Sequence, residues 1–159
     1  MKKTRKGGVI LLAIGLLMFS GGCLNDRNIC LQIYSVKQNR VLLSIPVQYN
    51  DVFTLDYIHS SEKTPICDYF TVTGAGTLLL TEEQFDWYAV GLEAHAGYTD
   101  SEIRFDGRKT RVLLNREFDP FPLRVGWVAR QVMTIRGQSI ALKELADPGD
   151  LLYISIVEP

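Results

Sequence analysis

Residues Tyr57 to Phe70 read YIHSSEKTPICDYF and place a cluster of polar side chains between two runs of alternating apolar residues. Side chains alternate between the two faces of a β-strand. On the first run, Val52 to His59, the residues that share one face are Phe53, Leu55, Tyr57 and His59. On the second run, Ile66 to Thr73, they are Ile66, Asp68, Phe70 and Val72. The stretch therefore predicts two antiparallel strands joined by a polar turn.

Short strand patterns continue on both sides of this hairpin. They cover Ile29 to Val36, Val41 to Val47, Thr77 to Thr81, Arg111 to Asn115, Leu123 to Val128, Gln131 to Arg136, Ile140 to Leu142 and Leu151 to Val157. Asp106-Gly107 predicts a hairpin turn. No helix of ten or more residues is expected, and turns recur every 8 to 12 residues or so. We therefore predict an all-β domain over residues 29–159, either a β-sandwich or a partly open barrel of short antiparallel strands.

The amino terminus has the layout of an export signal. Four basic residues in the first six precede an 11-residue apolar run, Val9 to Phe19, and small residues precede Cys23. A membrane-spanning helix needs about 20 apolar residues, so the run is short for one. Residues 1–22 are expected to be a signal peptide or an anchor, and residues 23–28 a short tether. Because the residues before Cys23 resemble a bacterial lipobox, lipidation of Cys23 is favoured over plain cleavage or an uncleaved anchor. The domain would then lie at the outer face of the cytoplasmic membrane or in the periplasm.

Charge argues against nucleic acid as a partner. Cleavage after Gly22 would leave 13 basic and 18 acidic residues, a net charge of −5. The charge is also unevenly divided, with −9 over Asn50 to Glu102 and +5 over Ile103 to Arg136. Either these segments neutralise each other on neighbouring strands, which we favour, or the basic segment forms a face for an anionic solute or acidic partner.

Two further residue types leave alternatives open. An oxidising compartment permits a disulfide between Cys30 and Cys67, but two buried free thiols fit the sequence equally well. The aromatic residues Trp87, Tyr88 and Trp127 are expected at core or half-buried sheet positions.

Common catalytic motifs are absent from the sequence, so the polar turn is the main candidate site. Across a six-residue loop, His59 would lie opposite Ile66 and Tyr57 opposite Asp68. Asp68 would then be the diagonal neighbour of His59 on the same face. The expected polar cluster consists of Tyr57, His59, Ser60, Glu62 and Asp68.

Three interpretations of this cluster compete. In the favoured one, His59 and Asp68 are a structural pair that satisfies polar groups at the end of a core strand. In the second, His59 and Glu62, with His95 or Asp68, bind a metal or a small ligand. In the third, His59 is a general base for Ser60 or Ser61, which strand alternation disfavours for Ser60. No cofactor is expected.

The same block resembles the hallmark of a bacterial domain-of-unknown-function family, number eighteen-fifty. The matching residues are His59, Ser60, Glu62, Pro65, Asp68 and Tyr69 or Phe70, with Ser61 in place of the usual valine and Asp68 where glutamate is more familiar. The similarity continues through Trp87 to Leu92 and through Leu123 to Val157.

The resemblance implies a context. Members of the family are small exported or membrane-attached proteins, commonly encoded beside tripartite TRAP transporters of the TAXI type, which move organic anions or amino acids. It implies a binding or interaction accessory whose partners are transporter membrane subunits or the solute-binding protein. The alternatives are a small metal-dependent or hydrolytic enzyme using His59 and Glu62, and an envelope scaffold without a ligand.

Overall fold

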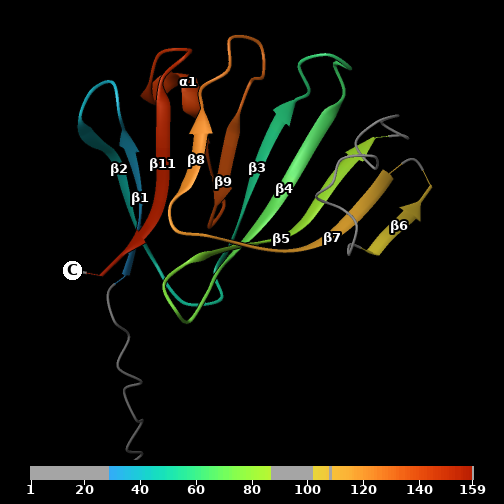
Figure 1. Cartoon of the computed structure of the whole chain (residues 1–159), viewed down its shortest axis with the longest axis horizontal. Helices are drawn as coiled ribbons and strands as arrows, with labels where there is room; N and C mark the ends of the chain where they lie inside the picture. The colour runs from blue at the N-terminus through green and yellow to red at the C-terminus, as the bar shows by residue number, and fades with distance from the viewer. Residues whose placement is uncertain (1–28, 87–101, 108, 159) are drawn as a thin grey trace, which may run out of the picture.

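The computed structural model describes residues 29–86, 102–107 and 109–158 and arranges them in two antiparallel sheets (Figure 1). The four-stranded sheet has the order β2 (Arg40–Val47), β1 (Ile29–Ser35), β11 (Leu151–Val157) and β8 (Phe121–Arg124). The seven-stranded sheet has the order β10 (Gln138–Ala141), β9 (Val132–Ile135), β3 (Val52–Ile58), β4 (Pro65–Val72), β5 (Leu78–Asp86), β7 (Lys109–Phe118) and β6 (Glu102–Asp106). One helical turn, α1 (Leu142–Leu145), follows β10.

The two sheets pack face to face, which makes the domain a β-sandwich. Every second residue of β1, β4 and β11 is buried, as expected for strands with one face in a core. Phe53 and Phe70 of the larger sheet stack with ring centroids 4.9 Å apart, and Phe121 of the smaller sheet lies 4.8 Å from Phe70. These aromatic contacts tie one sheet to the other, because Phe121 and Phe118 belong to consecutive strands in different sheets.

The all-β prediction is confirmed, and several details are too. The last strand has the predicted bounds, and Gly107 has the positive φ of 61° that the Asp-Gly hairpin requires. Charges are neutralised between neighbouring strands of the larger sheet, as expected. Arg111 of β7 contacts Glu82 of β5 at 3.0 Å, and Arg136, after β9, contacts Asp51, before β3, at 2.8 Å. The predicted signal segment with Cys23, and also Trp87, Tyr88 and His95, lie outside the described residues.

The predicted register of the central hairpin is wrong by two residues. Tyr57 pairs with Ile66 and Leu55 pairs with Asp68, so the strand ends at Ile58 and His59 lies in the loop. Two bonds fix this end: the Ile58 amide donates to the carbonyl of Ala129, and the His59 amide donates to the carbonyl of Thr64. Asp68 therefore lies deeper in the sheet than predicted, and His59 is not its diagonal neighbour.

Several connections meet at one end of the sandwich (Figure 1). These are the β1–β2 turn, the β3–β4 loop, the β8–β9 loop and the turn before β11. They are bonded to one another: Ser35 at the end of β1 donates to the Asp150 carboxylate, and the Val125 amide donates to the Asp150 carbonyl. Hydrogen bonds from Ser35 and from backbone amides hold the pKa of Asp150 below its ordinary value, although burial acts in the opposite direction. We call this end of the molecule the loop end.

Candidate functional site

The imidazole of His59 organises the β3–β4 loop instead of facing the sheet. Its Nδ1 atom accepts from the Glu62 amide at 3.3 Å and lies 3.1 Å from the Ser61 hydroxyl. Lys63 adopts a left-handed φ of 58°, which brings the chain back toward Thr64. An acceptor nitrogen that holds a backbone amide acts like a capping side chain, so His59 contributes to the shape of this loop.

Ser60 and Glu62, two other predicted members of the cluster, lie in the same loop, but their side chains form no hydrogen bond with the His59 ring in the described part of the chain. Ser60 contributes its carbonyl, which accepts from the Lys63 ammonium group. Glu62 is exposed and accepts from the Ser61 hydroxyl at 3.3 Å. Within residues 29–86, 102–107 and 109–158, no three His, Cys, Asp or Glu side chains are grouped so that they could hold a metal ion. His95, the third proposed ligand, lies outside these ranges.

Asp68 belongs to a different environment, the inner face of the seven-stranded sheet. Its side chain is only 6% exposed and lies directly across from Glu83 of β5, which is also buried. Burial, then the charge of Glu83, raise the pKa of Asp68 to about 8, although a hydrogen bond with Tyr57 acts in the opposite direction. Its Oδ1 atom is buried without a hydrogen-bond partner. Tyr57 and Asp68 are therefore neighbours, as predicted, but on a diagonal and not directly opposite each other. The third polar group beside them is Glu83 and not His59.

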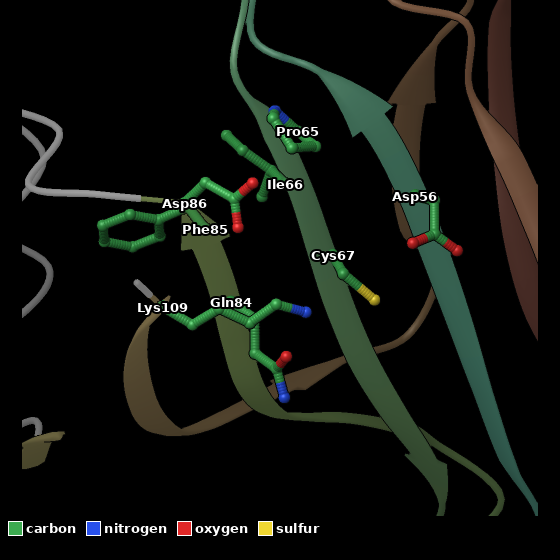
Figure 2. A pocket seen from close by; sticks show the side chains of 8 residues that line it. All are labelled: Asp56, Pro65, Ile66, Cys67, Gln84, Phe85, Asp86 and Lys109. Atoms are coloured by element: carbon green, nitrogen blue, oxygen red, sulfur yellow. The ribbon is translucent and has the colours of Figure 1, made fainter. Parts of the chain in front are cut away.

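The outer face of the same sheet carries a hollow of about 170 Å³ at the start of β4 (Figure 2). Cys67 and Asp56 face each other there from neighbouring strands, with Gln84 on the next strand and Asp86 and Lys109 completing the lining. Burial, then the hydrogen bond and charge of Asp56, raise the pKa of Cys67 to about 12. The thiol is consequently protonated at neutral pH and is a poor nucleophile.

The cysteines left open by the sequence are both free thiols. Cys30 lies on β1 of the smaller sheet and Cys67 on β4 of the larger sheet. Each alternates with buried core residues, so the two side chains point away from the sandwich on opposite sides.

The β8–β9 loop, residues 125–131, is braced at its base. The Gln131 side chain accepts from the Gly126 amide at 2.9 Å and donates to the Arg124 carbonyl at 3.1 Å. The Gly149 amide donates to the Val125 carbonyl at 2.8 Å. An ideal Cβ on Gly126 would lie 2.6 Å from the Cβ of Ala129, so the loop folds back too closely for any larger residue. The base of the loop is therefore held in place by these hydrogen bonds.

Trp127 and Val128 project from this braced tip. They are 82% and 58% exposed, and Trp127 is the most exposed large hydrophobic side chain in the described part of the chain. The expectation that Trp127 would be a core or half-buried strand residue is wrong. The strand β8 ends at Arg124, because the Gln131 side chain takes the Arg124 carbonyl and Gly126 starts the turn.

A second hollow, of about 310 Å³, lies beside this tip. Its apolar wall is formed by Val125, Trp127, Val128 and Pro148, and Gly126, Gln131, Arg130 and Lys143 complete the lining. Of the described residues that line this hollow, two are cationic and none is acidic. Neither Arg130 nor Lys143 forms an ion pair or a side-chain hydrogen bond with any described residue, unlike Lys37, Arg104, Arg111 and Arg136.

The tip residues were missed because the segment could be interpreted as a continuation of the strand. The available signal is local: Gly126 is followed by two large apolar residues and then by Ala129-Arg130, which breaks the alternation of a half-buried strand. The sequence contained no sign that Lys143, which is 16 residues after Trp127, would line the same hollow.

These features define an antiparallel β-sandwich with a braced, partly apolar and basic loop end. The chain belongs to the family described as Domain of unknown function (DUF1850), whose model matches residues 53–142. The matched region runs from β3 to the start of α1 and so includes both the His59 loop and the Trp127 loop. No curated protein and no solved structure matches the chain. None of the described helical residues belongs to a segment long and apolar enough to cross a membrane.

Proposed function

We propose that this protein is a binding accessory that docks a protein partner through its loop end. The observation that carries the proposal is the exposure of Trp127 and Val128 on a loop whose base is hydrogen-bonded in place. Tryptophan is enriched among the residues that dominate binding energy at protein interfaces. A loop whose base is already hydrogen-bonded in place also loses less conformational freedom when it binds, which favours affinity.

The partner that we propose is a component of a TAXI-type TRAP transport system for organic anions or amino acids, in line with the family resemblance. In this proposal the amino-terminal segment is an export signal, and lipid on Cys23 attaches the domain to the outer face of the cytoplasmic membrane.

Strand direction favours one of the two partner classes. β1 starts at Ile29, next to the amino-terminal segment, and ends at Ser35, which is bonded to the loop end. Seven strand residues span about 20 Å. An attachment through residues before Ile29 would join the domain at the end of β1 opposite to the loop end. The extracytoplasmic solute-binding protein is therefore favoured over the membrane subunits.

Co-purification tests the proposal. The full chain, expressed with the transporter genes and extracted from membranes, is expected to retain the solute-binding subunit, identified by mass spectrometry. Trp127→Ala should reduce the retained amount at least tenfold, because truncating a central interface tryptophan typically costs about 2 kcal/mol or more. Phe105→Ala is the matched control, since Phe105 is an aromatic residue, 59% exposed, on the edge strand β6. Equal retention by wild type and Trp127→Ala would exclude docking through this loop.

A further inference from the structure

The hollow beside Trp127 has a chemistry that selects its occupant. Its described lining combines the apolar residues Val125, Trp127, Val128 and Pro148 with two cationic residues, Arg130 and Lys143. Both residues are exposed, and neither charge is neutralised by a described side chain. Two carboxylates near this corner are engaged elsewhere: that of Asp147, beside Pro148, contacts Lys37 at 3.1 Å, and that of Asp150 accepts from the Ser35 hydroxyl.

We propose that this hollow receives an acidic side chain, Asp or Glu, flanked by apolar residues on an extended segment of the partner protein. The inference rests on the proposed function and specifies the chemistry of the partner's docking segment. The carboxylate would lie between Arg130 and Lys143, and the neighbouring apolar side chain would cover Val125 and Pro148 against the Trp127 ring.

The shape of the loop supports a site that exists before binding. The side-chain amide of Gln131 is already bonded to the Gly126 amide and the Arg124 carbonyl. It therefore holds the loop that lines the hollow, and the two cations are left to recognise a charged ligand. Arg124 is likewise engaged, because its guanidinium donates to the Gly149 carbonyl at 2.7 Å. Of the basic residues around the hollow, the two that line it are therefore the ones available to a ligand.

A protein segment fits this site better than an anionic lipid headgroup. The loop end lies at the opposite end of β1 from the amino-terminal segment, about 20 Å along the strand. A domain attached to a membrane through that segment would be tethered at the end opposite to the hollow, which leaves the hollow open to a protein partner.

Binding of a defined peptide tests the inference without the natural partner. The probe is an acetylated, dye-labelled peptide of alternating glutamate and leucine, and its counterpart with glutamine in place of glutamate is the reference. Fluorescence anisotropy with the full chain in detergent micelles is expected to show at least fivefold tighter binding of the acidic peptide. This preference should decline as salt is raised, since exposed charges are screened.

Variants connect the preference to the two cations. The double variant Arg130→Gln/Lys143→Gln should abolish the preference for the acidic peptide. The control Arg104→Gln/Lys109→Gln makes the same change in net charge on the other side of the molecule, at β6 and β7, and should retain it. Thermal unfolding of Arg130→Gln/Lys143→Gln should match wild type, because Arg130 and Lys143 make no described side-chain bond. The control loses the exposed Arg104–Glu102 pair at 2.8 Å, which should change the midpoint only slightly.

The outcomes separate this inference from the proposed function. Equal binding of both peptides, or an unchanged preference in Arg130→Gln/Lys143→Gln, would overturn the inference. So would displacement of the peptide by vesicles containing phosphatidylglycerol, which would indicate a lipid site. If the acidic peptide binds as expected while no transport subunit co-purifies, the site stands and the assigned partner is wrong. If Trp127→Ala loses the subunit while Arg130→Gln/Lys143→Gln keeps it, only the acidic specificity is wrong.

Discussion

Replacing Asp68 with asparagine is expected to make the protein more stable at neutral pH, the reverse of the usual effect of changing a buried residue. The Asp68 carboxyl is buried on the core face of β4, opposite the Glu83 carboxyl, and its Oδ1 atom has no hydrogen-bond partner. Burial and the Glu83 charge raise its pKa from 3.8 to about 8. Asparagine has nearly the same shape, retains an oxygen that can accept from Tyr57, and carries no charge.

The sign follows from the direction of the shift. The unfolded chain releases the Asp68 proton near pH 4, whereas the folded protein keeps it up to about pH 8. The contribution of Asp68 to the free energy of unfolding is therefore most favourable below pH 4, and it decreases as the pH rises toward 8. Each pH unit in that window costs roughly 1.4 kcal/mol, so the loss at pH 7 reaches about 4 kcal/mol at most. Because asparagine carries no charge across this window, we expect Asp68→Asn to recover about 2 to 4 kcal/mol at pH 7.

Urea unfolding followed by circular dichroism from pH 4 to pH 8 measures this effect. Wild type should lose stability across the window, and Asp68→Asn should show a flatter profile that meets that of wild type near pH 4. Asp106→Asn, an exposed change in a hairpin turn, should follow wild type. If Asp68→Asn is less stable than wild type at pH 7, or if the two profiles run parallel, the buried-acid argument is refuted.

Three further predictions concern the loops and the thiols. Gly126→Ala should destabilise the protein by about 1 to 3 kcal/mol, seen as a lower thermal midpoint, because the new methyl group would meet the Ala129 Cβ. An unchanged midpoint would show that the loop can open. His59→Ala should cost about 1 kcal/mol through the lost acceptor for the Glu62 amide, and no loss in urea unfolding would contradict that role. Cys30 and Cys67 should both be alkylated after unfolding without a reductant, and a requirement for prior reduction would contradict free thiols.

The fold could be predicted largely because strand signals are local. The alternation in Leu151–Val157 and the Asp106-Gly107 turn depend on neighbouring residues, and the structure confirms both. Register is different, because it depends on where the loop closes. The Ile58 amide bonds to Ala129, which is distant in sequence, and this contact ends the strand before His59. No local sequence pattern indicated that contact, so the predicted neighbourhood of His59 and Asp68 was wrong.

The candidate site was harder to predict from the sequence than the register. Trp127 has the residue type of a core position. It lies on an exposed tip because side-chain bonds of Gln131 within the loop and backbone bonds from Gly149 and Ile58 fold the loop back. The hollow beside it is lined by both Arg130 and Lys143. These two residues are separated in the sequence by the strands β9 and β10. Charge counting did identify a basic segment. The structure shows that Arg111 and Arg136 of that segment are neutralised by Glu82 and Asp51, whereas Arg130 is not.

Site-specific photo-cross-linking in cells tests docking through the loop end most directly. A photoreactive amino acid replaces Val128 in the full chain, and the control replaces Val52, which is similarly exposed at 52% but lies at the start of β3. The proposal predicts that position 128 cross-links to the solute-binding subunit of the transport system and that position 52 does not. The absence of that cross-link from position 128, or equal cross-linking from both positions, would contradict it.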